Sequence, residues 1–252
     1  MSTEDLNRFR DLTFEGFREL AQDASLSPYE KIGFPNSYRE GKEGAIFHDI
    51  RSKLGNLSRR RQTVVDIGPG CSNLPRMLIG SCREMEHEIV LVDSPEMLAL
   101  LPDEPFVRKV AGRFPAGCAS LLGDLAGRVD VLLSYSVLHY VFPQGSVFQF
   151  LDAALSLLAP GGEMLIGDIP NISKRKRFFS SAAGIQYHQQ FTGQQEAPAV
   201  SFNQAEPGQI DDAVMASIVL RSRASGFDAY WMPQSGELPM ANRREDILIR
   251  RP

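Results

Sequence analysis

Residues 64 to 73 of this 252-residue chain read Val64-Val65-Asp66-Ile67-Gly68-Pro69-Gly70-Cys71-Ser72-Asn73, a short apolar run that leads into a glycine turn. An apolar run without alternation is typical of a central parallel strand that is covered on both faces. Gly68 and Gly70 permit backbone angles closed to other residues, and without a Cβ they let a ligand approach the main chain. A helix after the turn would point unpaired N–H groups at that ligand. The stretch therefore predicts a strand, a ligand-binding turn and a helix over about Asn73 to Arg83.

A second apolar run, Glu88 to Asp93, ends in a carboxylate that lies 93 − 68 = 25 residues beyond the first glycine. In nucleotide-binding α/β units an acid at about this distance, at the tip of the next strand, holds the ribose hydroxyls. Asp93 fits that role. The full dinucleotide fingerprint requires a third glycine at position 73, which is Asn73 here, so a nicotinamide or flavin site is disfavoured.

Four motifs in order and spacing resemble those of the class I S-adenosylmethionine-dependent methyltransferases. They are Asp66-Ile67-Gly68-Pro69-Gly70, then Asp93, then Val129 to Ser134 with Val137-Leu138-His139, then Leu158-Ala159-Pro160-Gly161-Gly162. The resemblance covers about Thr63 to Ile249 and is strongest from Val64 to Asp168. More loosely, the turn Gly167 to Asn171 and the tail resemble methyltransferases encoded with bacterial surface-polysaccharide genes.

This resemblance implies S-adenosyl-L-methionine as the cofactor and assigns residues to it. In chain order these are Asp66, Gly68, Pro69, Gly70, Asp93, Ser94, Met97, Arg113, Phe114, Ser134 and Tyr135. Arg113 stands where such enzymes often place an acid for the adenine amino group, so either Asp124 or the backbone would supply that contact instead.

The predicted fold is α/β, a Rossmann-like doubly wound sheet of seven strands, mostly parallel with an antiparallel last strand. Residues 1–60 are predicted to form an N-terminal helical cap or lid, and residues 61–252 the methyltransferase domain, with an insertion at about 172–209 that faces the substrate. Further strands are expected at Phe106 to Val110, Glu163 to Asp168, Phe227 to Met232 and Glu245 to Arg250.

Helix signals are clear in some places and weak in others. Ser94-Pro95-Glu96 is a strong helix start, and Ser146 is expected to cap a helix that Pro160-Gly161-Gly162 ends. A helix is also expected from Asp211 and Asp212 to Gly226. At the N-terminus one amphipathic helix is expected over Leu6 to Leu20 and another over about Gly44 to Leu57, with Ser27 to Arg39 as a loop between them. Residues 186–209 show little periodicity and are expected to be irregular.

Composition indicates an ordinary globular protein, with 43% hydrophobic and 23% charged residues. The net charge of −4 argues against broad nucleic-acid binding, which requires a basic surface. The N-terminus lacks a secretory layout and no apolar run approaches a membrane span, so a cytoplasmic location is expected. Three cysteines without a C-x-x-C pair indicate reduced thiols, although a helix N-terminus would lower the pKa of the Cys71 thiol.

Candidate substrate contacts come from both sides of the predicted cofactor turn. Tyr29, Tyr38 and Arg39 are candidates in the cap, with simple packing as the alternative. Asp168 ends the expected strand Glu163 to Asp168 and Asn171 lies just beyond it, and both would bind acceptor hydroxyls or cap the next helix. Lys174 begins a basic run that would suit a phosphate or uronate, or is a solvated helix face.

Two histidines are candidate bases for O-methylation, because an attacking hydroxyl must lose its proton and histidine titrates near neutral pH. His139 lies just past the fourth strand, and His188 lies in the insertion. A three-ligand magnesium site of the catechol-methyltransferase type is incomplete at Ser134-Tyr135-Ser136, so no metal is expected.

The predicted function is methyl transfer to a small polar acceptor, with a hydroxyl of a sugar or nucleotide sugar in surface-polysaccharide biosynthesis favoured. The alternatives are an NAD-dependent oxidoreductase and a methyltransferase-like subunit that binds without catalysis. The oligomeric state is not predicted.

Overall fold

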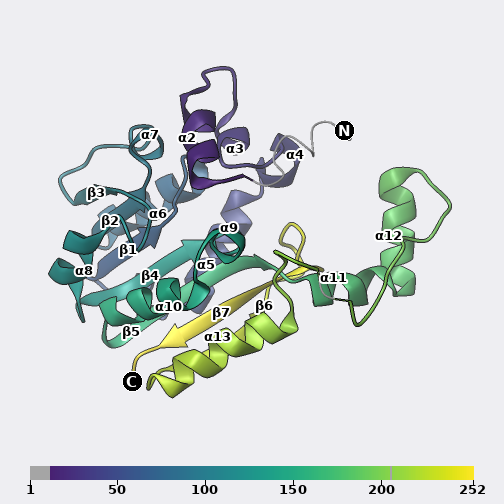
Figure 1. Cartoon of the computed structure of the whole chain (residues 1–252). Coiled ribbons are helices and arrows are strands. Elements are labelled where there is room, and N and C mark those ends of the chain that lie inside the picture. The colour runs from purple at the N-terminus through teal and green to yellow at the C-terminus, as the bar shows by residue number, and fades with distance from the viewer. Residues whose placement is uncertain (1–11, 205) are drawn as a thin grey trace.

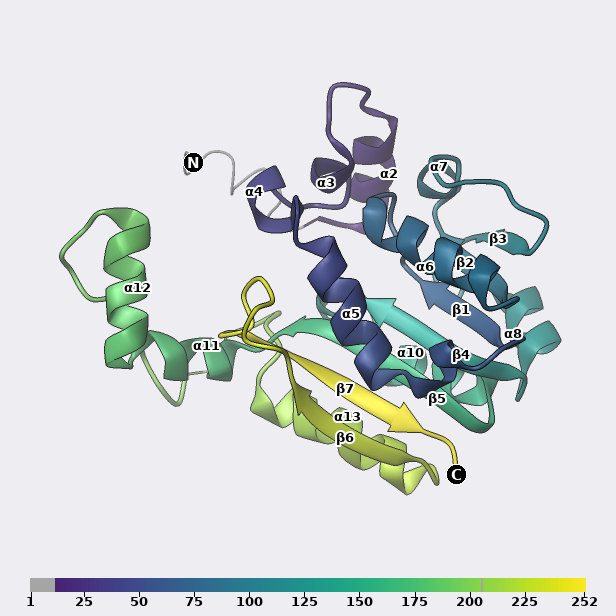
Figure 2. The same cartoon turned by 180° about the vertical axis from the view of Figure 1, so that it is seen from behind.

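The computed structural model describes residues 12–204 and 206–252, and its centre is a seven-stranded sheet of order β3-β2-β1-β4-β5-β7-β6 (Figures 1 and 2). In chain order the strands are β1 Thr63–Ile67, β2 Glu88–Asp93, β3 Val107–Ala111, β4 Val129–Tyr135, β5 Leu158–Pro170, β6 Asp228–Pro233 and β7 Arg244–Arg250. The first five are parallel, and β7 runs antiparallel to both β5 and β6. The predicted Rossmann-like sheet is confirmed.

The strand order reverses between β1 and β4, which are parallel neighbours. In open α/β sheets a crevice forms at this reversal, outside the carboxyl ends of the strands. The turn after β1 and the loops after β2 and β4 therefore meet at one edge of the sheet.

Helices cover both faces of the sheet. One face carries α8 (Ala119–Leu125), α9 (Leu138–Gln144), α10 (Val147–Leu157) and α13 (Asp212–Ala224), and the other carries α5 (Glu43–Lys53), the short 3-10 helix η1 (Gly55–Ser58), α6 (Asn73–Glu84) and α7 (Pro95–Leu98). Successive strand residues point to opposite faces of the sheet, so Val64 packs in the core on one face and Val65 in the core on the other. Because α5 packs on the sheet, part of the predicted cap belongs to one of these two cores.

The N-terminal segment lies over the carboxyl edge of the sheet as α2 (Phe14–Gln22), α3 (Pro28–Lys31) and α4 (Asn36–Arg39) (Figure 1). An ion pair and an aromatic contact help to hold it there. Arg18 makes a bidentate ion pair with Glu96 at the start of α7, with nitrogen–oxygen distances of 3.0 and 2.8 Å. Phe17 packs edge-on against Tyr140 of α9 at 4.8 Å between ring centroids.

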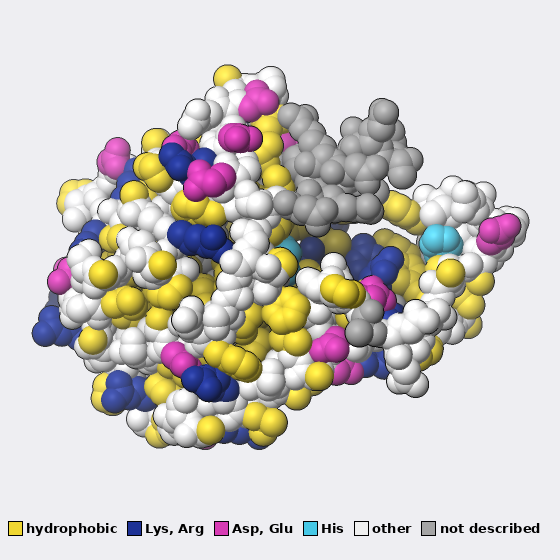
Figure 3. All heavy atoms as spheres, viewed as in Figure 1, with side chains coloured by type: hydrophobic (Ala, Val, Ile, Leu, Met, Phe, Trp, Pro, Cys, Tyr) yellow, Lys and Arg dark blue, Asp and Glu magenta, His cyan; other side chains and the backbone are white. Residues whose placement is uncertain are grey.

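Two helices, α11 (Ile172–Phe179) and α12 (Ala182–Thr192), form an arm that stands away from the sheet (Figure 1). In the space-filling view a hollow separates the arm from the body of the molecule (Figure 3). The arm is held together by an aromatic cluster in which Phe178 and Tyr187 lie 5.7 Å apart between ring centroids. The backbones also approach closely, because a Cβ on Gly184 would lie 1.9 Å from the carbonyl oxygen of Phe178.

Several expected boundaries are wrong. The segment from Ser27 to Arg39 is not a loop, since Ser27 and Glu30 form a capping box that starts α3, and α4 follows. The helix before β1 ends at Lys53 rather than Leu57, and α10 ends at Leu157, ahead of the Pro160-Gly161-Gly162 turn. The chain is helical up to Thr192, so irregular structure begins later than residue 186. Leu6 and Phe9 of the predicted first helix lie outside the described residues.

Candidate functional site

The glycine turn after β1 has the backbone that its sequence predicts. Gly68 and Gly70 have φ values of 75° and 66°, in the left-handed region that favours glycine. A Cβ on Gly68 would lie 2.5 Å from a methyl carbon of Val137, and a Cβ on Gly70 would lie 2.5 Å from one of Ile32. The glycines therefore admit two protein side chains, and the ligand space opens beside them.

That space is a cavity of about 330 Å³ at the strand-order reversal. It is lined by the glycine turn, the tip of β2, the β3–α8 loop and the β4–α9 loop. The cap completes it with Phe14, Phe17, Ile32, Phe34, Arg39 and Glu43. Of the residues that the sequence assigns to the cofactor, the cavity is lined by Gly68, Pro69, Gly70, Asp93, Met97, Arg113, Phe114 and Tyr135.

Asp93 presents its carboxylate to this cavity from the end of β2. One oxygen accepts the backbone N–H of Gly70 at 3.0 Å and the other accepts that of Ser94 at 2.7 Å. Burial raises the pKa of Asp93 to about 6, although these two hydrogen bonds lower it. The carboxylate thus joins the glycine turn to the tip of β2.

Ser94, Asp66 and Ser134 lie behind the cavity wall rather than in it. The hydroxyl of Ser94 caps α7 by accepting the N–H of Met97 at 3.2 Å. Asp66 is buried, and burial together with the charge of Asp93 raises its pKa to about 8. Ser134 is buried as well, and its hydroxyl has no hydrogen-bond partner within the described residues. Their predicted direct contacts with a cofactor are not supported by these positions.

The β3–α8 loop forms the far wall, where the adenine was expected. Phe114 packs edge-on against Phe150 at 5.3 Å between ring centroids, and the guanidinium of Arg113 donates to the carbonyl of Gln144 at 3.3 Å. Both side chains line the cavity.

A β-bulge changes the direction of the side chains near the end of β5. The β5–β7 register shifts between Ile166 and Ile169, so that Gly167 and Asp168 lie opposite the single residue Asp246. Asp168 has a φ of 58°, and Ser136, just after β4, has a φ of 61°. Left-handed backbone in residues other than glycine is strained and concentrates at functional sites.

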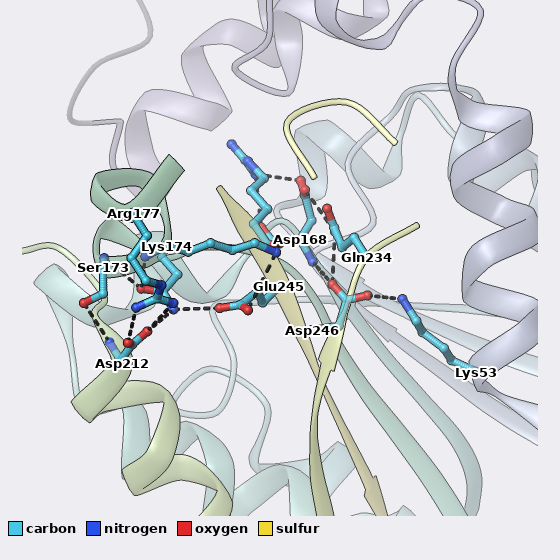
Figure 4. Close-up of polar contacts among 11 residues, drawn as sticks. Lys53, Asp168, Ser173, Lys174, Arg177, Asp212, Gln234, Glu245 and Asp246 are labelled. Carbon is cyan, nitrogen blue, oxygen red and sulfur yellow. Dashed lines mark hydrogen bonds and ion pairs between the residues drawn. The ribbon is translucent and has the colours of Figure 1, made fainter. Parts of the chain in front are cut away.

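The re-aimed Asp168 is the centre of a buried polar network (Figure 4). Its carboxylate accepts from Arg39 and from Arg244, each at 2.7 Å, and from the hydroxyl of Ser136. Although burial raises the pKa of Asp168, the two guanidinium groups lower it below its ordinary value. Its backbone N–H donates to Asp246 at 2.8 Å. With its oxygens engaged in this way, Asp168 orients Arg39 and Ser136 rather than facing the cavity.

Glu43, which the sequence analysis did not select, lies at the other end of the cap's contact with the sheet. It is 4% exposed and lines the cavity from the first turn of α5. One of its oxygens accepts the hydroxyl of Ser72 at 2.6 Å, and the other accepts the N–H of Asn73 at 3.1 Å. Ser72 is the N-cap residue of α6, but its side chain makes no capping hydrogen bond. The carboxylate of Glu43, from α5, caps the helix instead.

The remaining cap candidates do not line the cavity. Tyr29 hydrogen-bonds to Glu43, and burial and this carboxylate raise the pKa of Tyr29. Tyr38 is half-buried in α4. Of the three candidates in the cap, only Arg39 reaches the cavity.

Asn171 and Lys174 lie at the base of the arm and have structural partners. Asn171 is buried and caps α11 by accepting the N–H of Ser173 at 2.9 Å, the second of the two roles considered for it. Lys174 donates to the carbonyl of Arg244 at 3.0 Å (Figure 4).

Neither candidate base lines the cavity. His139 is half-buried, with an Nδ1 that has no partner within the described residues, and burial together with the nearby Arg244 lowers its pKa to about 3. Such a histidine is neutral at pH 7 but is a weak base. His188 lies on α12, against the edge of Phe179.

Residues 12–204 and 206–252 contain no group of three or more His, Cys, Asp or Glu side chains that could hold a metal ion. No helix among them is both long and apolar enough to cross a membrane. The expectation for Cys71 is wrong, because this thiol is buried and burial raises its pKa to about 11.

The sequence matches no protein-family model and no curated protein. Solved structures do match the fold. The CurJ carbon methyltransferase aligns with a TM-score of 0.59 at 15% identity over 98% of this chain, which spans 65% of that protein. The plantazolicin methyltransferase BamL, solved with a triazolic desmethylPZN analogue and SAH, gives 0.56 at 11% identity over 99% of this chain and 98% of its own. The N-methyltransferase NodS from Bradyrhizobium japonicum WM9, solved with SAH, gives 0.53 at 11% identity over 95% and 98%. The chain therefore has the Rossmann-like methyltransferase fold.

Proposed function

We propose that this protein transfers a methyl group from S-adenosylmethionine to a small acceptor. The observation that carries the proposal is the cavity at the strand-order reversal, where Asp93 and the glycine turn form one wall. Asp93 has the position and chemistry to accept hydrogen bonds from ribose hydroxyls. The structural neighbours BamL and NodS, which were solved with SAH, support the same cofactor.

When bound, the cofactor would supply a methyl group on a sulfonium sulfur, and the neutral thioether would be a good leaving group. The protein's own task is to align the acceptor and exclude water, and such alignment contributes on the order of 7–11 kcal/mol. The cap does this, because Phe14, Phe17 and Phe34 close the cavity over the carboxyl edge of the sheet. We assign the catalysis to this enclosure rather than to His139, whose lowered pKa makes it a weak base.

The acceptor is proposed to be small and to have an apolar face, since aromatic side chains of the cap and Tyr140 line the cavity. A sugar or nucleotide sugar is compatible with a cavity lined by aromatic side chains, because a pyranose ring has an apolar face that packs on aromatic rings. Its hydroxyl oxygen would take the methyl group, the thioether would leave, and the hydroxyl proton would pass to solvent, because neither His139 nor His188 lines the cavity. The narrower role in surface-polysaccharide biosynthesis rests on the resemblance of the turn Gly167 to Asn171, and a screen of sugar acceptors tests it.

An NAD-dependent oxidoreductase is disfavoured by a specific contact. Dinucleotide-binding folds place the pyrophosphate at the N-terminus of the helix after the glycine turn. Here the carboxylate of Glu43 accepts the N–H of Asn73 at that helix terminus. A pyrophosphate would therefore face a buried negative charge.

Calorimetric titration tests the cofactor. We expect SAH to bind the wild-type protein with micromolar affinity and NADH not to bind. Asp93→Ala should weaken SAH binding at least about tenfold, because charge-assisted hydrogen bonds are lost. Asp103→Ala is the matched control, since the Asp103 side chain is 92% exposed and should leave binding unchanged.

Binding of NADH alone would overturn the proposal. Binding of SAH without transfer of radiolabelled methyl to any member of a sugar and aromatic-alcohol screen would favour the non-catalytic subunit.

A further inference from the structure

Glu43 is a buried carboxylate without a countercharge. It is 4% exposed, and within the described residues it makes no ion pair; its partners there are the Ser72 hydroxyl, the Asn73 N–H and the Tyr29 hydroxyl. Burying an ionised carboxylate is costly unless a cation or a metal compensates it. Because Glu43 also lines the cavity, a cationic group of the ligand can supply that compensation.

At the tips of β4 and β5 the buried charges include more cations than anions. Two guanidinium groups, those of Arg39 and Arg244, share the one carboxylate of Asp168. Arg39 is 4% exposed and uses Nη2 for both Asp168 and Ser136, while its buried Nε has no acceptor within the described residues. A buried donor is rarely left unpaired in a native structure. Since Arg39 lines the cavity, an anionic group of the ligand can accept from it.

The two charges belong to one short segment of the cap. Arg39 is the last residue of α4 and Glu43 is the first of α5, so four positions separate them. Arg39 contacts Ser136 after β4, whereas Glu43 contacts Ser72 and Asn73 after β1. The pair thus brackets the strand-order reversal with a positive group on one side and a negative group on the other.

We propose that Arg39 and Glu43 bind the amino-acid end of the cofactor, with Arg39 on its carboxylate and Glu43 on its ammonium group. This inference rests on the proposed function. It moves Arg39 from the acceptor to the cofactor and adds Glu43, a residue that no sequence motif marks. Asp168, Ser136 and Arg244 are then positioning residues that hold the Arg39 guanidinium over the cavity.

Two ligands with the same adenosyl thioether test the assignment by calorimetry. SAH carries the zwitterion, and 5′-methylthioadenosine lacks it. We expect the wild-type protein to bind SAH about 100-fold more tightly than 5′-methylthioadenosine. Arg39→Gln and Glu43→Gln should each weaken SAH binding by about 10- to 100-fold and change the affinity for 5′-methylthioadenosine by less than about threefold.

Matched controls come from the same segment. Glu40 and Lys42 are exposed, so Glu40→Gln and Lys42→Gln remove one charge of each sign without touching the cavity and should leave the ratio of the two affinities unchanged. The ratio is measured within each variant, so a general loss of stability does not imitate the effect. Arg39→Lys keeps the charge next to Asp168 and should retain part of the preference for SAH if Arg39→Gln does not fold.

The outcomes separate this inference from the proposed function. Failure of the wild-type protein to bind either ligand would overturn the cofactor itself. If the wild-type protein binds SAH and the ratio of the two affinities stays the same in Arg39→Gln and Glu43→Gln, only the assignment of these residues to the amino-acid end of the cofactor is overturned. Arg39 and Glu43 would then be expected to bind a zwitterionic acceptor.

Discussion

Asp66 and His139 show how burial changes individual residues next to the cavity. A low-dielectric environment disfavours the charged form of a side chain, so it raises the pKa of an acid and lowers that of a base. The pKa of Asp66 rises to about 8 and that of His139 falls to about 3. Both side chains are therefore neutral in the folded protein at pH 7.

Asp66 should make the protein less stable as the pH rises from 6.5 to 8. In this window the unfolded Asp66, with its ordinary value of 3.8, has lost its proton, whereas the folded one keeps it until about pH 8. The unfolded state therefore binds fewer protons, and the free energy of unfolding falls by up to about 1.4 kcal/mol per pH unit. His139 acts weakly in the opposite direction, because its unfolded form, with an ordinary value of 6.5, is half protonated at pH 6.5 and the cost of about 0.4 kcal/mol fades by pH 8.

Urea unfolding at pH 6.5 and pH 8 measures this slope. The wild-type protein should lose up to about 2 kcal/mol, and Asp66→Asn should lose almost nothing. Asp103→Asn, at an exposed site, should follow the wild type. Equal slopes for the wild type and Asp66→Asn would contradict the assignment.

Single residues were predictable from the sequence where a local motif fixes them. Gly68, Gly70 and Asp93 lie at strand ends, and the motif alone placed all three at the cavity. Glu43 was not predictable, because its role depends on α5 crossing the N-terminus of α6. The direct role of Asp66 was predicted from its place in the motif, but the alternation of side chains along β1 turns it away from the cavity.

At the scale of elements, the arm formed by α11 and α12 depends on one glycine. A Cβ on Gly184 would meet the carbonyl oxygen of Phe178 at 1.9 Å, a backbone atom that cannot move cheaply. Gly80, in the interior of α6, has no atom within 4 Å of the same added Cβ. The same substitution should therefore act in opposite directions at the two positions.

Gly184→Ala should loosen α12, raising amide hydrogen exchange there at least about tenfold while exchange in the sheet stays unchanged. Gly80→Ala should stabilise the protein by about 0.5–1 kcal/mol, because alanine reduces the freedom of the unfolded chain. Thermal unfolding together with exchange mass spectrometry measures both. Unchanged exchange in α12 of Gly184→Ala would show that the close approach is not required.

The elements that the sequence predicted well are those with strong local signals. Ser94 and Ser146 cap their helices as expected, and Asp211 caps α13. The arm's α12 was missed because Gln, His and Tyr along it give no apolar stripe. It contacts α11 through Tyr187, which lies in the middle of the helix, and Phe178. Low hydrophobic periodicity therefore wrongly predicted irregular structure for residues 186–192, which are helical.

For the whole molecule, Lys53 joins the N-terminal part of the chain to its last strand. From the end of α5 it contacts Asp49 at 2.6 Å and Asp246 of β7 at 2.7 Å, all three being buried (Figure 4). Asp246 in turn accepts the N–H of Asp168, whose carboxylate holds Arg39 at the cavity. Removing one partner of such a network leaves uncompensated buried charge.

Lys53→Met should accordingly lower the free energy of unfolding by about 3–5 kcal/mol. Lys42→Met, at an exposed position just before α5, should change it by less than about 0.5 kcal/mol. Guanidinium unfolding followed by circular dichroism compares them. Similar midpoints for the two variants would show that the network carries little of the stability.

The order of the strands could be predicted only through the resemblance. Periodicity locates each strand, but it does not say that β7 inserts between β5 and β6. Nor does it predict the β-bulge opposite Asp246, which depends on how two distant strands pair. These are properties of the whole chain.

The sheet ends in β3 on one side and β6 on the other, and both outer strands carry side chains that hinder the addition of a further strand. β3 has the exposed Arg108, and β6 begins with the exposed Asp228 and ends with Pro233, which lacks an N–H. Charges and proline on an outer strand are the usual protection against edge-to-edge growth. Two copies of this protein should consequently resist joining their sheets into fibrillar aggregates, even at the high concentrations of a crowded cell.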